Sequence, residues 1–186
     1  MGQLLNDLWD IESTHQEALC YAVASTTGPI VELGGGYYST PLLHGLCEPT
    51  QRELWTIEGW EPWYENLNCW EAPWHHVIFD DEHRIPVEHP GVVFVDHDSG
   101  DIWLDEWNSM GQRKRLNRAG ATRGQAISKA HESETDLVVV HDTQPEHAIF
   151  YPGMQEAIDE WRFTRTYKLP SPGAWTTICS DIRDFR

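Results

Sequence analysis

The chain has 186 residues, a formal net charge of −17, and a composition that is 40% hydrophobic and 23% charged. This length suits one domain with a full hydrophobic core, which we predict over residues 1–186. A surface so negative repels phosphate backbones, and no stretch approaches the roughly 20 apolar residues of a membrane span. Nucleic acids and membranes are therefore not expected as partners.

The first residues carry no targeting pattern. The stretch MGQLLNDLWDIESTHQ lacks the basic region and the apolar region of a signal peptide. The chain has four cysteines without paired spacing, namely Cys20, Cys47, Cys69 and Cys179. Their distribution argues against a zinc site and a disulfide framework and favours a reducing compartment, so the expected location is the cytoplasm.

Helical and strand patterns are predicted to alternate along the chain. An N-terminal helical segment over residues 1–27 has helically spaced apolar side chains between Leu4 and Ser25. Short apolar runs, typical of buried parallel strands, follow at Ile30–Leu33, Leu54–Ile57, His76–Phe79, Val92–Val95 and Leu137–Val140. Helical segments between them begin near Ser39 or cover Trp60–Trp70 and Gly124–His131. Two last strands, Phe163–Leu169 and Trp175–Cys179, flank a Pro/Gly turn. This order predicts an α/β layered sheet that ends in an antiparallel hairpin.

A run of basic residues interrupts this acidic chain. Between Gly111 and His131 no acidic residue occurs, and the cations are Arg113, Lys114, Arg115, Arg118, Arg123 and Lys129. We interpret the run as a solvated helix face. The alternative is a basic rim that receives an anionic substrate.

Most predicted strands end in an acidic residue. Glu58, Asp80, Asp96 and Asp142 each follow an apolar run. Because the carboxyl ends of parallel strands meet at one edge of a sheet, these carboxylates are expected to gather where such sheets bind ligands.

The stretch VELGGGYYST, residues 31–40, places three glycines between a strand and a capped helix. This geometry brings bare backbone close to a nucleotide-like ligand, although an ordinary turn also uses glycine. Glu58, at the end of the next strand, can accept hydrogen bonds from both hydroxyls of a ribose. A nicotinamide dinucleotide would place its pyrophosphate beside Glu32, which is unfavourable. The cationic sulfonium of S-adenosyl-L-methionine tolerates that carboxylate and fits better.

With these residues in view, the chain resembles the class I S-adenosylmethionine-dependent methyltransferases. VELGGGYYST is similar to their first motif, TIEGW to their second-strand acidic residue, and the order of elements matches over nearly the whole chain. The resemblance implies a Rossmann-like three-layer α/β/α sandwich whose mostly parallel seven-stranded sheet has an antiparallel last strand. It implies cofactor contacts from Glu32, Gly34, Gly35, Gly36, Ser39, Glu58, Gly59, Trp60 and Asp96. For Trp60, stacking on adenine and packing in the core are alternatives.

Within that superfamily, VFVDHDSG and VVVHDT resemble small-molecule O-methyltransferases of the sugar and antibiotic-tailoring type that use a divalent metal. The resemblance implies that Asp96 and Asp142 bind Mg²⁺ or another divalent cation and that Asp98 is the general base. His141 stands where the family has a further Asp, and imidazole also coordinates divalent ions. The alternative is that these aspartates cap loops and helices.

The sequence also suggests roles for an arginine and for four histidines. Arg123 is expected to orient Asp98 or to bind a substrate carboxylate, with a plain surface arginine as the alternative. His15, His75, His76 and His147 lack recognisable ligand spacing and are predicted to be structural or solvent-facing.

The leading hypothesis is therefore a methyltransferase that acts on a hydroxyl of a small molecule, either as a monomer or as a homodimer. A second hypothesis is a cofactor-binding module, or a non-methylating enzyme, on the same fold. A metal-dependent hydrolase that uses His141 and Asp142 ranks last.

Overall fold

A seven-stranded sheet forms the centre of the computed structural model, which describes residues 14–97, 100–107, 113–118, 121–147, 150–168 and 174–185. The strand order is β3-β2-β1-β4-β7-β9-β8. These strands are β1 (Ile30–Leu33), β2 (Leu54–Glu58), β3 (His75–Phe79), β4 (Val92–Val95), β7 (Leu137–His141), β8 (Phe163–Tyr167) and β9 (Thr176–Ser180). Strands β3, β2, β1, β4 and β7 are parallel, and β9 runs antiparallel to both β7 and β8. The expected antiparallel last strand is confirmed.

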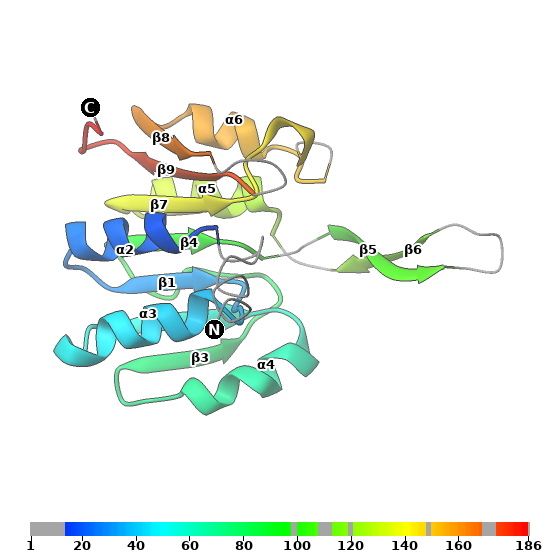
Figure 1. Cartoon of the computed structure of the whole chain (residues 1–186), viewed down its shortest axis with the longest axis horizontal. Coiled ribbons are helices and arrows are strands. Elements are labelled where there is room, and N and C mark those ends of the chain that lie inside the picture. The colour runs from blue at the N-terminus through cyan, green and yellow to red at the C-terminus, as the bar shows by residue number, and fades with distance from the viewer. Residues whose placement is uncertain are drawn as a thin grey trace, which may run out of the picture.

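Helices cover both faces of the sheet (Figure 1). The helices are α2 (Gln16–Ser25), α3 (Ser39–Cys47), α4 (Glu61–Leu67), α5 (Arg123–Glu132) and α6 (Met154–Asp159). Single 3₁₀ turns lie at Glu48–Thr50, Asn68–Trp70 and Pro145–His147. The expected helix over residues 4–25 appears as α2, and its first part lies outside the described residues.

Two apolar clusters, one on each face of the sheet, explain why the strand sequences are continuous apolar runs. One cluster joins α5 and α6 to one face of the strands, through Ala126, Ile127, Met154, Ile158, Val31, Leu33, Val93, Val95, Val138 and Val140. The other joins α2 and α3 to the opposite face, through Ala18, Leu19, Leu43, Cys47, Ile30, Leu54, Val92, Phe94, Leu137 and Val139. Alternate residues of each strand point to opposite faces, so a strand buried on both sides is apolar throughout. The predicted three-layer α/β/α sandwich is confirmed.

The basic run is not a single helix. Arg113–Arg118 form strand β6, which pairs antiparallel with β5 (Gly100–Trp107) in a separate two-stranded ribbon. Figure 1 shows this ribbon projecting away from the sheet, on the side where β1 and β7 end. The helical prediction therefore holds only from Arg123 onward, where α5 begins. The charged sequence of β6, RKRLNR, does not mark it as a strand.

The carboxyl ends of β2, β1, β4 and β7 lie side by side. Leu33 pairs with Ile57 on one side and Val95 on the other, and Val95 pairs with Val140. The residues that follow these positions thus meet at one edge of the sheet, as the sequence predicts. Among the described residues, no helix combines the length and the apolar character needed to cross a bilayer.

Candidate functional site

The glycine turn between β1 and α3 is shaped first by packing within the protein. Gly34 has a φ of +88°, and a Cβ there would lie 2.6 Å from the Cα of His97. A Cβ on Gly35 would overlap the side chain of Leu67. Gly36 differs, because an added Cβ would meet only the Ser39 hydroxyl, at 3.0 Å. Two of the three glycines are therefore required by close internal contacts, and only Gly36 has space for a ligand.

Glu32 supports this turn from below. Its side chain is fully buried, and Oε2 accepts hydrogen bonds from Thr40 Oγ1 at 2.9 Å and Thr56 Oγ1 at 2.7 Å. The same Thr40 hydroxyl accepts the backbone N–H of Gly36 at 3.0 Å. Burial raises the pKa of Glu32 to about 7, although the hydroxyls of Ser39, Thr56 and Thr40 oppose the rise. Glu32 thus holds the turn through Thr40.

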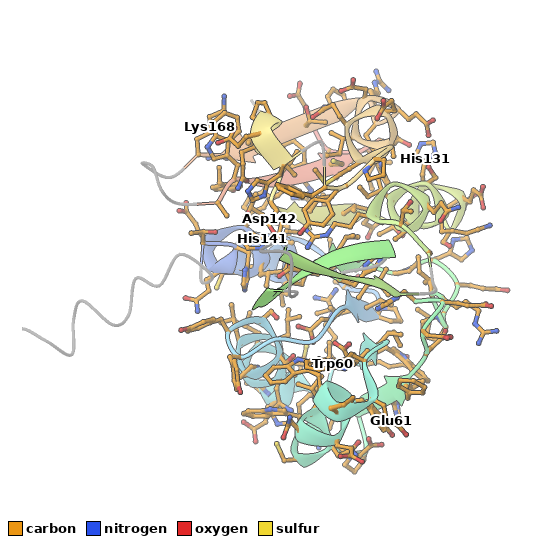
Figure 2. All side chains as sticks on the ribbon, turned by 90° about the vertical axis from the view of Figure 1, so that its right-hand side faces the viewer. Trp60, Glu61, His131, His141, Asp142 and Lys168 are labelled. Carbon is orange, nitrogen blue, oxygen red and sulfur yellow. The ribbon has the colours of Figure 1, made fainter. Side chains whose placement is uncertain are left out.

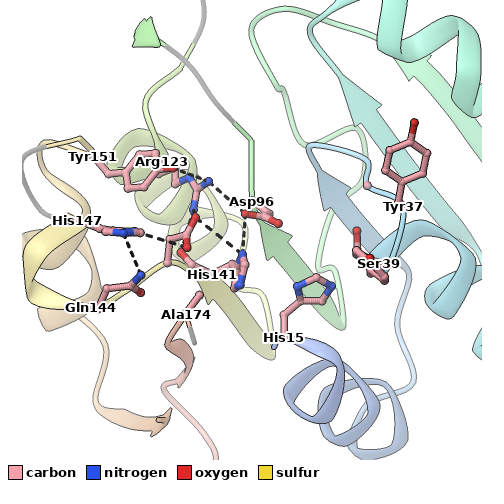
Figure 3. Close-up of a pocket in the computed structure, with 13 residues that line it drawn as sticks. His15, Tyr37, Ser39, Asp96, Arg123, His141, Gln144, His147, Tyr151 and Ala174 are labelled. Carbon is pink, nitrogen blue, oxygen red and sulfur yellow. Dashed lines mark hydrogen bonds and ion pairs between the residues drawn. The ribbon is translucent and has the colours of Figure 1, made fainter. Parts of the chain in front are cut away.

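A pocket of about 420 Å³ opens where β1, β4 and β7 end (Figure 3). This volume is within the range of small-molecule sites. The glycine turn and the start of α3 form one wall, and the ends of β4 and β7 form the other. The lining residues are His15, Gly36, Tyr37, Tyr38, Ser39, Asp96, Arg123, His141, Asp142, Gln144, His147, Tyr151 and Ala174.

Asp96 and His141 meet across the ends of β4 and β7. His141 Nδ1 donates to Asp96 Oδ1 at 3.1 Å, and its Nε2 hydrogen-bonds with Thr14 Oγ1 at 2.9 Å. Burial acts to raise the pKa of Asp96, but the charges of His141 and Arg123 outweigh it and hold that pKa at about 2. For His141, burial acts to lower the pKa, but the negative charges of Asp96 and Asp142 together have the larger effect. The pKa of His141 is therefore raised. Asp96 is therefore an ionised carboxylate at neutral pH.

Arg123 is a buried clamp and not a surface arginine, because only 2% of its side chain is exposed. Its Nε donates to the carbonyl oxygen of His97 and its Nη1 to that of His141, both at 2.9 Å, while Nη2 donates to Asp96 Oδ1 at 3.1 Å. Its guanidinium also stacks on the Tyr151 ring, 3.8 Å from the centroid. One side chain therefore fixes the ends of β4 and β7 relative to each other.

His15 is one of the pocket residues that the sequence prediction did not assign to the site. It precedes α2 and is 2% exposed, with its ring against Phe94 and edge-on to His141 at centroid distances of 5.1 and 4.9 Å. Neither of its ring nitrogens has a hydrogen-bond partner in the part of the chain that the structure describes. Burial lowers the pKa of His15 to about 4. His15 is therefore a neutral imidazole with open nitrogens, and it is not solvent-facing.

Asp142 lies on the other side of the clamp. Its backbone is in the left-handed region, with a φ of +60°. Its Oδ2 lies 3.6 Å from Arg123 Nη1, and its Oδ1 lies 3.5 Å from His147 Nδ1. His147 is 3.0 Å from the Gln144 amide and lines the same pocket, so it too belongs to the site. No spacing in the sequence marks His15, because its contacts with Phe94 and His141 join residues far apart in the chain. His147 contacts near neighbours in the sequence, Asp142 and Gln144, but this spacing is not a recognised ligand pattern.

The predicted ribose-binding group lies beside this pocket and does not line it. The carboxylate of Glu58 accepts the Trp60 backbone N–H at 2.7 Å, and a Cβ on Gly59 would lie 2.7 Å from the His83 ring. Trp60 is 46% exposed, which excludes the core-packing alternative. Figure 2 shows Trp60 apart from His141 and Asp142 on this edge.

The predicted site residues thus fall into three groups. Gly36, Ser39, Asp96, Arg123, His141 and Asp142 line the pocket. Gly34 and Gly35 form the turn with Glu32 buried beneath it, and Glu58, Gly59 and Trp60 lie at the end of β2 and in the loop that follows. Asp98, the predicted general base, lies outside the described residues.

The metal set implied by the resemblance does not form as such. Arg123 contacts both carboxylates of that set, at 3.1 Å for Asp96 and 3.6 Å for Asp142. Among the described residues, the donor atoms that converge to within 4.8 Å belong to His15, Asp96 and His141. The imidazole of His15 thus stands in this group of donors, and Asp142, the oxygen donor expected there, is not part of it.

Comparisons with known proteins agree with this architecture. No protein-family profile matches the sequence, and no curated protein is significantly similar to it. The fold is similar to that of the O-methyltransferase TomG from Streptomyces achromogenes, solved in complex with SAM, at 16% identity and a TM-score of 0.55 over 91% of this chain and 79% of that one. An O-methyltransferase from Bacillus cereus, in complex with SAH, matches at 13% identity and a TM-score of 0.56, over 91% and 80%. The SAH-bound methyltransferase PaMTH1 of Podospora anserina matches at 12% identity and a TM-score of 0.51, over 87% and 75%. The chain therefore has the fold of the class I S-adenosylmethionine-dependent methyltransferases.

Proposed function

We propose that the chain is an S-adenosylmethionine-dependent methyltransferase that acts on a hydroxyl group of a small molecule. The observation that carries this proposal is that one pocket joins the glycine turn to the Asp96–His141 pair. A cofactor held at the turn would thus lie beside ionisable groups that can bind an acceptor. The fold alone would not carry the proposal, because one fold serves many activities.

The residues present suit the aminoacyl half of the cofactor best. Gly36 has space on its pocket side, and Ser39 lies in the same wall, at the start of α3. Beneath them, Glu32 has a buried oxygen, Oε1, without a hydrogen-bond partner among the described residues. The nucleoside half would extend toward the loop of Glu58, whose carboxylate accepts ribose hydroxyls in this type of fold. When bound, the cofactor supplies an electrophilic methyl group.

The chain's own contribution is alignment and proton removal. Arg123 fixes Asp96 and the backbone of His141, so the acceptor would meet a rigid wall, and alignment is the main requirement of an in-line transfer. A hydroxyl must lose its proton during the transfer. We propose Asp98 for this step, since it follows the pocket residue Asp96 by two positions.

The proposal is tested by calorimetric titration with S-adenosylhomocysteine. If Glu58 holds the ribose, Glu58→Ala should lower the affinity by about 1.5–3 kcal/mol, which is roughly 10- to 150-fold. Glu61→Ala is the matched control, because it removes an exposed carboxylate in the first turn of the neighbouring α4 and should leave the affinity unchanged. Absence of binding to the wild type, or equal affinity of wild type and Glu58→Ala, would refute the cofactor site.

Turnover is tested separately from binding. Production of S-adenosylhomocysteine should be followed over a panel of hydroxylated sugars and metabolites. Asp98→Asn should keep the cofactor affinity and lose the transfer. A wild type that binds the cofactor but methylates no hydroxyl compound would instead favour the binding-module hypothesis.

A further inference from the structure

We infer that His15, Asp96 and His141 form a binding site for a divalent transition-metal ion such as Zn²⁺ or Co²⁺, and not for Mg²⁺. The site takes one donor from each of three elements, the residue before α2, the end of β4 and the end of β7. This inference concerns the metal alone and stands whether or not the chain transfers methyl groups.

The donor set decides the class of metal. Two imidazoles and one carboxylate converge, with all donor atoms within 4.8 Å of one another. Imidazole suits Zn²⁺, Fe²⁺, Ni²⁺ and Cu²⁺, whereas Mg²⁺ prefers oxygen ligands and near-octahedral geometry. Asp142, the second carboxylate of the set implied by the resemblance, is directed to Arg123 and His147 instead.

His15 supplies the independent evidence that the cluster is built for a ligand. A buried imidazole normally has hydrogen-bond partners, because leaving a buried polar group unsatisfied is costly. His15 is 2% exposed, lines the pocket, and has two ring nitrogens without a partner in the described parts of the chain. Figure 3 shows its ring directed from α2 toward Asp96 and His141. A metal ion would satisfy the nitrogen that faces the other two donors.

The distance between Asp96 and His141 also suits two ligands of one ion. His141 Nδ1 and Asp96 Oδ1 are 3.1 Å apart. Metal–ligand bonds of roughly 2.1 Å place neighbouring donors about 3.0–3.4 Å apart. A cation can therefore replace the proton that these atoms share.

The surroundings orient the donors as outer partners of a metal site do. His141 Nε2 bonds to Thr14 Oγ1 at 2.9 Å, so with Nδ1 on the metal this nitrogen would carry the proton and donate to the hydroxyl. Arg123 holds Asp96, and its own charge is balanced by Asp142 at 3.6 Å. Asp96 and His141 are thus held in place by residues outside the three-donor set.

The test is a metal titration of the full-length, tag-free protein after removal of bound metal with EDTA. ZnCl₂ and MgCl₂ are titrated by calorimetry, and CoCl₂ is followed through its visible absorption bands. We expect one Zn²⁺ or Co²⁺ per chain and no Mg²⁺ heat. His15→Gln should weaken Zn²⁺ binding by at least about tenfold, since loss of even an outer-shell partner costs 10- to 100-fold.

Three further variants make the outcome decisive. His147→Gln removes an imidazole from the same pocket and should leave Zn²⁺ affinity unchanged, whereas Asp142→Asn, which removes the charge that balances Arg123, should weaken Zn²⁺ binding less than His15→Gln does. Asp96→Asn should abolish the Co²⁺ bands while circular dichroism shows an intact fold. The inference is overturned if no transition metal binds, if Mg²⁺ binds as well as Zn²⁺, or if Asp142→Asn abolishes binding and His15→Gln does not. A parallel titration with S-adenosylhomocysteine reports on the proposed function independently.

Discussion

Substitution of Gly34 tests whether the glycine turn is shaped by the protein or by a ligand. Gly34 has a φ of +88°, and an added Cβ would lie 2.6 Å from His97 Cα, 2.7 Å from His97 N and 2.9 Å from the Asp96 carbonyl carbon. All three atoms are backbone, so no side chain can rotate away. Gly34→Ala must therefore either strain the turn or push it away from the end of β4.

The expected cost combines three contributions. A non-glycine residue in the left-handed region costs roughly 1–2 kcal/mol, and overpacking a tight contact costs about 1–3 kcal/mol. The lower entropy of the unfolded alanine chain returns about 0.4–1 kcal/mol. We expect Gly34→Ala to lower the free energy of unfolding by about 2–4 kcal/mol, which corresponds to a fall in Tm of about 5–15 °C for a chain of this size.

Two other glycines serve as controls in the same urea-unfolding assay. Gly45 lies within α3 with no atom within 4 Å of an added Cβ, so Gly45→Ala should stabilise the protein by about 0.5–1 kcal/mol. Gly36→Ala should change stability by less than about 1 kcal/mol, because only the Ser39 hydroxyl must move. It should still weaken S-adenosylhomocysteine binding, because Gly36 lines the pocket. A loss below about 1 kcal/mol for Gly34→Ala would show that our account of the turn is wrong.

Two further predictions concern buried charge. Arg123→Lys cannot reproduce the hydrogen bonds to Asp96 and to two backbone carbonyls, so it should lower the free energy of unfolding in urea by about 3 kcal/mol or more. The control Lys129→Ala removes an exposed ion pair and should lower it by less than about 1 kcal/mol. Since burial raises the pKa of Glu32 from 4.5 to about 7, its protonated form stabilises the fold below pH 4.5, and this contribution is lost as the pH rises through 7. The stability of the wild type relative to Glu32→Gln should therefore fall between pH 4.5 and 7.5, and a flat difference would contradict the burial argument.

The sheet was predictable because its strands are buried on both faces. Val92–Val95 is apolar throughout, and Leu137–His141 is apolar except for its last residue. Such strands show no alternation of apolar and polar residues, and they are recognised by the length of the apolar run and by the acidic residue that follows it. The hairpin of β5 and β6 was missed for the opposite reason. Arg113–Arg118 pair with another strand outside the sheet, and backbone pairing alone imposes no apolar pattern on a sequence.

The site was predictable only where it follows strand ends. Asp96 directly follows β4 and His141 is the last residue of β7, so the pairing of these two strands brings them together. His15 reaches them because α2 packs over the face that contains Phe94, which is a tertiary contact without a sequence signal. Arg123 looked like one cation of a basic run. Its burial follows from the capping box of Thr122 and Gln125, which starts α5 beside the ends of β4 and β7.

The acidic strand ends divide into two kinds, and the division locates the chemistry. Asp80 accepts the backbone N–H groups of Glu82 and Arg84, so it stabilises its own loop. Glu58 likewise accepts a backbone N–H of the following loop, from Trp60. Asp96 differs from both, because its Oδ1 is held by Arg123 and His141 from other elements. Carboxylates at the β2 and β3 ends thus organise the loops that follow them, whereas charge at the β4 and β7 ends is concentrated on a pocket. Reaction or metal chemistry is therefore expected at β4 and β7, and substitutions at Asp80 should act on stability alone.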